Sequence, residues 1–319
     1  MSEKIIATPS IAIGTWAWGD SGKNGDGYFG STLTPEGLKE VVDKAIQSGF
    51  TLWDTAAVYG MGHSESALAE ALKGHDRSEY QLSTKFTPQI ASASDNPVEE
   101  MLNQSLKRLN TDYIDIYWIH NPADVEKWTP YLIPLLESGK IKHVGVSNHN
   151  IEQIKHANEI LGQAGYRVEA VQNHFSLLYR SSEEAGVLKY CEENQIKFFS
   201  YMVLEQGALT GKYNIDNPLP AGSERAEIYN KLLPQLQDLT AKMKVIGDKY
   251  GVSTADIATA WAISKGTTPI IGVTKSKYIA DYQKIKQIKL TESKMKELEK
   301  LATATHVDTR GNWEKPMDE

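Results

Sequence analysis

The sequence predicts an α/β protein in which parallel strands close into a (β/α)8 TIM barrel, with long loops after the strands and an extra C-terminal helix. Short apolar, β-rich runs alternate with helical segments along all 319 residues. Runs such as 114–119 (IDIYWI) are apolar enough for burial on both faces, as parallel sheets require. No linker interrupts this alternation, so residues 1–319 are expected to form a single domain. An open, doubly wound sheet gives the same alternation of strands and helices and is the main alternative fold.

The strands are expected where four to eight apolar or β-branched residues lie between turn-forming residues. In chain order they are 10–15, 51–55, 80–85, 113–119, 141–147, 169–175, 196–201 and 268–273.

The helices are expected where apolar residues recur three and four apart, as Leu38, Val41 and Val42 do in the first helix. Capping patterns support three starts: Asn96 before Pro97, Ser181 with Glu184, and Thr291 before a final helix. In chain order the helices before the final one are 35–48, 64–73, 97–109, 124–138, 151–163, 182–194, 232–265 with a break near Gly251, and 275–285.

Two segments are predicted to be loops. Residues 204–231 form the longest irregular stretch and end in NPLPAGSER, which is typical of a lid or a disordered segment. Gly25, Gly27 and Gly30 spell a dinucleotide fingerprint, but they do not stand between a strand and a helix, so we reject that motif. The same loop lacks acids at two calcium-ligand positions, Gly22 and Ser31, and is read as a surface loop.

Composition restricts the partners and the compartment. A net charge of −7, with no basic cluster, argues against nucleic-acid binding. The single cysteine, Cys191, excludes an internal disulfide and fits a reducing cytoplasm. No leader-like start and no apolar run of 18 residues is visible, so neither export nor membrane spanning is expected.

Polar residues end several of the predicted strands, where apolar ones would be expected. Asp54 closes TLWD, Lys85 closes YQLSTK and His120 closes YIDIYWIH, while Tyr59 stands in the loop after Asp54. The C-terminal ends of the strands form the catalytic face of such barrels. Taken singly, each residue has an ordinary explanation: a packed tyrosine, a helix cap, a snorkelling lysine or a core histidine. Together they predict a site for proton transfer.

Six ordered segments resemble the aldo-keto reductases, a family of (β/α)8 barrels that reduce carbonyl groups with NADPH. They are GTWAWG (14–19), WDTAAVYG (53–60), STK (83–85), SLKRLNTDYIDIYWIH (105–120), GKIKHVGVSN (139–148) and PIIGVTK (269–275). The resemblance is to bacterial-type members, and GTWAWG is similar to a plant pyridoxal-reductase-like branch. It implies that Tyr59 donates a proton, that Lys85 and Asp54 tune it, and that His120 orients the carbonyl.

Elementary electrostatics agrees with those roles. Lowering the pKa of a phenol from about 10 by about 3 units requires about 4 kcal/mol. One ammonium group at ~4 Å supplies about that much at an effective dielectric constant of ~20. The sequence therefore predicts that Lys85 lowers the pKa of Tyr59, while Asp54 keeps Lys85 protonated. Only a cofactor can supply the hydride.

The resemblance also implies a nicotinamide site. Ser147, Asn148 and Gln172 are expected to bind the carboxamide, and the ring of Tyr201 to stack on the nicotinamide. Trp16, Tyr59 and His120 are expected to contact the substrate. The full set implied for the cofactor is Gly14, Thr15, Trp16, Asp54, Ser147, Asn148, Gln172, Tyr201, Leu204, Gly207, Gly272, Thr274, Lys275, Lys277 and Asp281.

Three departures from the family pattern bear on cofactor choice. Met202-Val203 replaces a common Ser-Pro, and Tyr278 and Tyr282 replace an arginine and an asparagine that contact the adenosine half. Lys275 and Lys277 remain near the start of the same helix, where a phosphate is favoured. NADP(H) is therefore the preferred cofactor, with NAD(H) left open.

The expected function is reduction of aldehydes or ketones to alcohols, with a small aromatic aldehyde as a plausible substrate, by a monomer or small homo-oligomer. One alternative is a nicotinamide-nucleotide-binding regulatory subunit, similar to the potassium-channel β-subunits, which carry an N-terminal extension that is not seen before the first strand here. The second alternative is a metal-dependent hydrolase. Only His120 and Asp54 stand at strand ends as candidate metal ligands, which is too few for a typical site, so no metal is expected.

Overall fold

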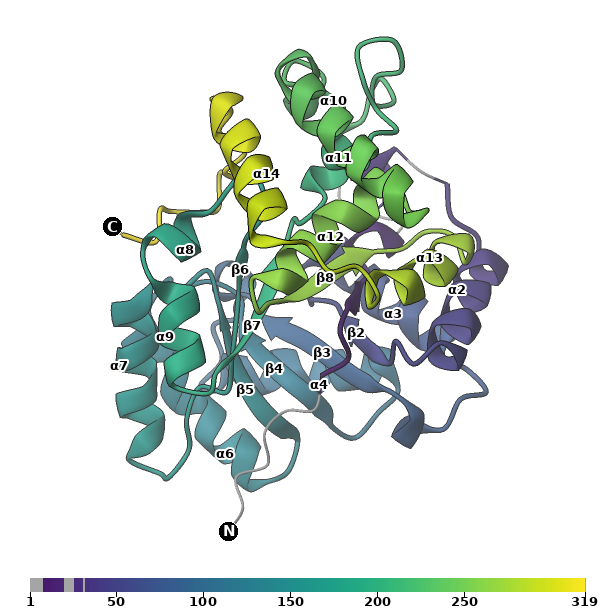
Figure 1. The fold of residues 1–319 in the computed structure, drawn as a ribbon. Coiled ribbons are helices and arrows are strands. Elements are labelled where there is room, and N and C mark those ends of the chain that lie inside the picture. The colour runs from purple at the N-terminus through teal and green to yellow at the C-terminus, as the bar shows by residue number, and fades with distance from the viewer. Residues whose placement is uncertain (1–7, 20–25, 31, 319) are drawn as a thin grey trace.

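The strands of the computed structural model, which describes residues 8–19, 26–30 and 32–318, form a closed barrel. All neighbouring pairs are parallel, and β1 pairs with both β2 and β8 (Figure 1). This closure confirms the barrel and excludes the open sheet. The strands are β1 (Ala12–Gly14), β2 (Leu52–Asp54), β3 (Gln81–Phe86), β4 (Ile114–Ile119), β5 (Ile141–Ser147), β6 (Ala170–His174), β7 (Lys197–Tyr201) and β8 (Thr268–Gly272).

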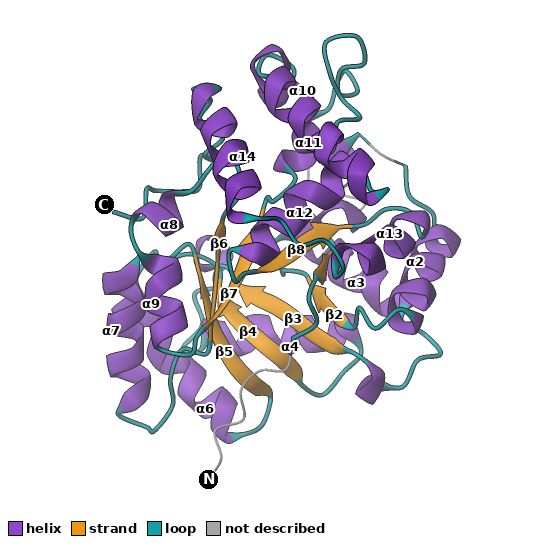
Figure 2. Ribbon diagram, viewed as in Figure 1, coloured by secondary structure: helices purple, strands orange, loops and turns teal. Residues whose placement is uncertain are grey.

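Helices surround the strands, as the purple ribbons around the orange arrows of Figure 2 show. Within the described ranges, none is long and apolar enough to cross a membrane. The helices are α1 (Asp26–Phe29), α2 (Pro35–Gln47), α3 (His63–Ala71), α4 (Pro97–Leu109), α5 (Val125–Trp128), α6 (Leu132–Glu137), α7 (Ile151–Gly162), α8 (Ser181–Glu184), α9 (Val187–Glu193), α10 (Glu224–Tyr229), α11 (Gln237–Tyr250), α12 (Thr254–Ser264), α13 (Lys277–Ile285) and α14 (Glu292–Ala304).

The predicted helix starts and breaks are mostly confirmed. Asn96 accepts a hydrogen bond from the Glu99 amide at the start of α4, and Thr291 accepts one from the Lys294 amide at the start of α14. The break near Gly251 is real, because this residue adopts a left-handed conformation with φ 66° that ends α11.

Two helical predictions are wrong in detail. The helix expected at 182–194 is split into α8 and α9 by Gly186, whose φ is 77°. The one expected at 124–138 is interrupted by a 3-10 turn between α5 and α6. The predicted Ser181 cap is also wrong, because Arg180 is the N-cap residue and the Ser181 hydroxyl instead accepts the Met317 amide at 2.8 Å.

The two predicted loops have partial structure of their own. Segment 204–231 contains a 3-10 turn, η6 (Glu205–Thr210), and the short helix α10. These pack around a small apolar cluster that includes Leu219, Tyr229 and Leu233. The glycine-rich loop lies partly outside the described residues, at 20–25 and 31, and Asp26–Phe29 form α1.

The barrel interior is filled by side chains that point inward from the strands. Trp118 and Phe199 pack edge to face with ring centroids 5.4 Å apart. The Trp118 ring fits because residue 145 on the neighbouring strand is glycine: a Cβ atom there would lie 2.1 Å from the ring. The indole nitrogen donates to Ser83 at 2.5 Å, so this packing also fixes a polar group of β3.

Gly145→Ala should therefore lower the free energy of unfolding by about 2–3 kcal/mol, because the added methyl group overlaps Trp118 and neither strand can move alone. Gly162→Ala is the matched control, since it lies at the end of α7, and its Cβ atom would meet nothing within 4 Å. Urea unfolding of both variants measures the difference, and equal stability of the two would contradict this account of the interior.

Candidate active site

Asp54 and Lys85 form a buried ion pair at the C-terminal ends of β2 and β3. The Lys85 ammonium donates to Asp54 Oδ2 at 2.6 Å and to the Thr55 carbonyl at 2.7 Å. Asp54 Oδ1 also accepts from Ser83 at 2.7 Å and from the Gln172 amide at 3.1 Å. The ammonium is fully buried and the carboxylate nearly so. The strand register brings the pair together, because Asp54 on β2 is the direct partner of Ser83 on β3, and Lys85 lies two residues after Ser83.

Tyr59 lies in η2 (Tyr59–Gly62), the 3-10 turn that follows β2. Its ring centroid is 5.0 Å from the Lys85 ammonium and 5.8 Å from the imidazole centroid of His120. The structure thus brings together all four side chains predicted for catalysis. Gly60 and Gly62 adopt positive φ in this turn, at 55° and 94°, which lets the chain fold back after the tyrosine.

The electrostatic prediction for Tyr59 is wrong in direction. Burial, followed by the nearby Asp54 carboxylate, raises the pKa of Tyr59 well above its usual value. The Lys85 ammonium, 5.0 Å from the ring, does not reverse this shift. Burial also lowers the pKa of Lys85, although Asp54 opposes that shift. The phenol therefore holds its proton at neutral pH.

His120 is held by a residue that the sequence analysis missed. The Thr87 hydroxyl lies 2.8 Å from His120 Nδ1. Burial, and then the charge of Lys85, lower the pKa of His120 well below its usual value, so the imidazole is neutral. Thr87 follows β3 directly, two residues after Lys85, and its position next to a strand end was the available signal.

The residues predicted to hold the nicotinamide carboxamide lie on adjacent strand ends. Ser147 and Gln172 are register partners, and the Ser147 hydroxyl donates to the Gln172 carbonyl at 2.7 Å. Asn148 has φ 63°, and its amide nitrogen donates to the His120 carbonyl at 2.9 Å. The Tyr201 hydroxyl lies 2.6 Å from Asn148 Oδ1. Two buried side-chain amides beside an aromatic ring match the chemistry of a flat carboxamide, so the fit to this group is good.

The residues of the first strand have different surroundings. Gly14 is paired with both Asp54 and Gly272. The Thr15 hydroxyl is fully buried, where it meets the Asp54 carbonyl at 3.2 Å and Ser64 at 2.9 Å, so it supports the strand ends and is not free for a ligand. Trp16 is partly buried, and its ring stacks on Tyr59 at 5.9 Å.

Trp16 is the centre of an aromatic group at the barrel mouth. Besides Tyr59, its ring contacts Tyr28 at 4.9 Å, Phe29 at 5.1 Å and Trp313 at 6.1 Å. Trp313 comes from the C-terminal segment and is 49 % exposed. The sequence analysis gave no role to Tyr28, Phe29 or Trp313, because only the folded chain brings them to this place.

The residues predicted for the rest of the cofactor extend from β7 to α13. Leu204 precedes η6, and Gly207 within that turn has φ 107°. Gly272 ends β8 beside open space. Beyond it, Thr274 is partly buried, while Lys275 and Lys277 are exposed around the start of α13. Asp281 pairs with Lys284 at 3.1 Å.

The two tyrosines that depart from the family pattern differ from each other. Tyr282 is buried against Phe50, with ring centroids 6.2 Å apart, so it belongs to the core. Tyr278 is partly buried, and the Lys277 ammonium lies 5.2 Å from its ring.

A buried charged cluster adjoins these strand ends and was not predicted. His174, at the end of β6, lies 3.0 Å from Glu205 and 3.0 Å from Glu314. Although burial opposes its charged form, the two carboxylates raise the pKa of His174 to about 10. Glu205 has φ 47°, and Glu314 belongs to the segment after α14. The ionisable residue ending β6 was a usable signal, but no local pattern marks Glu314.

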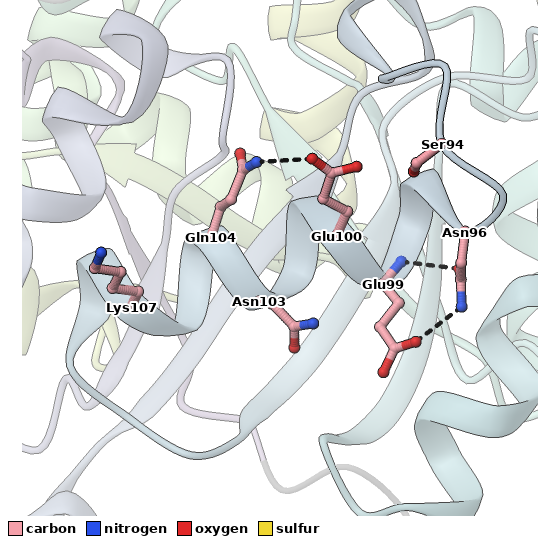
Figure 3. Close-up of a pocket in the computed structure, with 7 residues that line it drawn as sticks. All are labelled: Ser94, Asn96, Glu99, Glu100, Asn103, Gln104 and Lys107. Carbon is pink, nitrogen blue, oxygen red and sulfur yellow. Dashed lines mark hydrogen bonds between the residues drawn. The ribbon is translucent and has the colours of Figure 1, made fainter.

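A separate hollow of about 510 Å³ lies along α4 (Figure 3). Its walls are polar side chains of one helix and the turn before it, and some of them bond to each other, as Gln104 does to Glu100 at 3.4 Å. None of the residues predicted for catalysis lines it. We therefore place the candidate site at the barrel mouth.

Two known proteins are similar to this chain over most of its length. Pyridoxal reductase from the chloroplast of Arabidopsis thaliana is 30 % identical over 310 residues, which cover 92 % of this chain and 83 % of that protein. An NADP(+) aldo-keto reductase of Schizosaccharomyces pombe is 30 % identical over 287 residues, covering 82 % of each.

Solved structures share the fold at lower identity. Glycerol dehydrogenase from Gluconobacter oxydans superposes with a TM-score of 0.77 at 24 % identity, covering 94 % of this chain and 95 % of that one. An aldo-keto reductase from Klebsiella pneumoniae, solved with NADPH, gives 0.72 at 22 % identity, covering 92 % and 91 %. The sequence profile described as "Aldo/keto reductase family" matches residues 10–303. The chain therefore belongs to the aldo/keto reductase family.

Proposed function

We propose that this oxidoreductase reduces aldehydes or ketones to alcohols with NADP(H), and that Tyr59 is the general acid. The observation that carries the proposal is the meeting of Tyr59, His120 and the Lys85–Asp54 pair at one end of the barrel. A reduced nicotinamide nucleotide supplies the hydride when bound. The relative from Schizosaccharomyces pombe, which carries NADP(+) in its name, supports this cofactor.

Tyr59 can donate a proton because it keeps that proton at neutral pH. As hydride reaches the carbonyl carbon, negative charge develops on the carbonyl oxygen, and proton transfer from Tyr59 neutralises it. Lys85, 5.0 Å from the phenol ring, favours the phenolate that remains. Asp54 holds Lys85 in place at 2.6 Å.

His120 is proposed to orient the carbonyl. In this proposal the Thr87 hydroxyl, 2.8 Å from Nδ1, donates to that nitrogen, so that the imidazole proton is on Nε2. A neutral Nε2–H can then donate to the carbonyl oxygen without competing as an acid.

Small aromatic aldehydes are the proposed substrates. Trp16 stacks on Tyr59, and Tyr28, Phe29 and Trp313 surround Trp16. Aromatic surfaces of this kind favour a flat ring over an aliphatic chain. The similarity to the pyridoxal reductase of Arabidopsis thaliana supports a heteroaromatic aldehyde as a substrate.

The test measures loss of NADPH absorbance with a panel of aromatic and aliphatic aldehydes, pyridoxal included. We expect turnover with aromatic aldehydes at kcat/KM at least about tenfold above aliphatic ones of similar size. NADPH fluorescence measures cofactor binding separately. Binding without turnover on any aldehyde or ketone would refute the enzyme and favour a regulatory nucleotide-binding role. Absence of binding would refute both.

Cofactor preference should depend on Lys275 and Lys277. Both are exposed near the start of α13, which favours an anion such as the 2′-phosphate. Replacing both with alanine should weaken NADPH binding about 10- to 50-fold and leave NADH binding within about twofold. Lys286→Ala, near the other end of α13, is the control. Equal losses for the two cofactors would exclude a 2′-phosphate contact.

A further inference from the structure

The segment after α14, residues 305–318, returns to the barrel mouth and is fixed there at two points. The Thr309 hydroxyl donates to Glu205 at 3.0 Å. The Met317 amide donates to Ser181 at 2.8 Å, and the Met317 side chain is buried. Figure 1 shows the C-terminus beside α8, in agreement with this contact. Between the two points lies Glu314, whose side chain is 1 % exposed.

Glu314 is an ionised acceptor in this position. Its Oε2 lies 3.0 Å from His174 Nδ1 and accepts the Gly311 amide at 3.0 Å. Burial opposes ionisation, but His174 outweighs it and lowers the pKa of Glu314. The other groups that face His174 are Glu205 at Nε2 and the stacked rings of Tyr179 and Tyr201, at 4.4 and 5.5 Å.

The Tyr201 hydroxyl stands between two acceptors but has one proton. It is 2.5 Å from Glu314 Oε1 and 2.6 Å from Asn148 Oδ1. The Asn148 amide nitrogen is committed to the His120 carbonyl, so the group facing Tyr201 is the amide oxygen. Hydrogen bonds to an ionised carboxylate are about twice as strong as neutral ones, so Glu314 takes the proton.

This leaves Asn148 Oδ1 without a donor from Tyr201. Asn148 stands at the end of β5, next to Ser147, whose hydroxyl is directed to the Gln172 carbonyl. In the proposed function this amide oxygen would accept a hydrogen bond from the carboxamide of the nicotinamide nucleotide.

We propose that Glu314 is a positioning residue for the nicotinamide nucleotide, which holds the Tyr201 hydroxyl and thereby keeps the Asn148 carbonyl oxygen free to accept from the carboxamide. The proposal rests on the proposed function. It assigns a binding role to a residue of the C-terminal segment that acts through Tyr201.

The experiment is a double-mutant cycle on the dissociation constant of NADPH, measured by its fluorescence. Glu314→Ala should weaken binding about 5- to 20-fold, because Tyr201 then donates to Asn148 and competes with the carboxamide. In the Tyr201→Phe background no hydroxyl competes, so Glu314→Ala should change binding less than about twofold. Lys315→Gln, an exposed neighbour in the same segment, should leave binding unchanged.

Each outcome decides the question. Equal losses in both backgrounds would show that Glu314 acts on the fold of the segment and not through Tyr201, which overturns the proposal, as would no loss at all. Glu314→Gln, which keeps the side-chain size, should lose about 2- to 5-fold with the same dependence on Tyr201 and decides the case if the alanine variant does not fold. Failure of the unmodified protein to bind NADPH would appear before any variant is made and would refute the proposed function itself.

Discussion

Tyr59→Phe should lower kcat for aldehyde reduction by about 10²- to 10⁴-fold while leaving the NADPH dissociation constant within about threefold. Phenylalanine keeps the ring that stacks on Trp16 at 5.9 Å, so the aromatic surface remains. It removes only the hydroxyl, which in the proposed mechanism is the sole source of the proton. The separation of turnover from cofactor binding is therefore the diagnostic result.

The matched control is Tyr166→Phe, which removes a hydroxyl from a partly buried tyrosine after α7. It should leave both turnover and binding unchanged. Stopped-flow measurement of a single turnover separates chemistry from product release. If Tyr59→Phe reduced aldehydes at the unmodified rate in that assay, another group would have to supply the proton and the assignment would be wrong.

The strands were predictable because the barrel buries them on both faces. Each observed strand lies within two residues of its predicted limits, since apolar runs bounded by turn residues fix a strand without knowledge of its neighbours. Helices were less well predicted where backbone conformation overrides periodicity. Gly186 divides α8 from α9, and an isolated glycine in a helical pattern does not reveal its φ.

The candidate-site residues that lie at strand ends could be predicted from the sequence. Those brought to the site from distant parts of the chain could not. Asp54, Lys85 and His120 follow from the rule that strand ends share one face, and register brings them together. Glu314 reaches Tyr201 across 113 positions of the chain and His174 across 140. A lone acid in a polar tail carries no periodicity, so its place depends on tertiary contacts alone.

The direction of the Tyr59 pKa was missed for a physical reason. The sequence argument included Lys85 and its pairing with Asp54, but it left out the burial of the phenol, which is the largest cause of the raised pKa of Tyr59. Desolvation acts on every buried ionisable group, and its size depends on burial that only the folded chain defines.

Lys85→Met should reduce the free energy of unfolding by about 3–5 kcal/mol and abolish turnover. Methionine has nearly the volume of lysine but removes the ammonium, which leaves the Asp54 carboxylate buried with Ser83 and Gln172 as its remaining donors among the described residues. Removing one partner of a buried ion pair lowers stability by this amount because an uncompensated buried charge remains. Urea unfolding followed by circular dichroism measures the change. Lys244→Met, from the exposed pair with Asp248, is the control and should have little effect.

The double variant Lys85→Met/Asp54→Asn separates the structural role of the pair from its catalytic role. Asparagine is isosteric with aspartate and can still accept from Ser83, so removing both charges should restore most of the stability lost in Lys85→Met. Turnover should stay absent, because no cation then favours the Tyr59 phenolate. A stable double variant without activity would assign the ammonium to catalysis. Recovery of turnover together with stability would mean that Lys85 serves only the fold, and the proposed proton transfer would lose its electrostatic support.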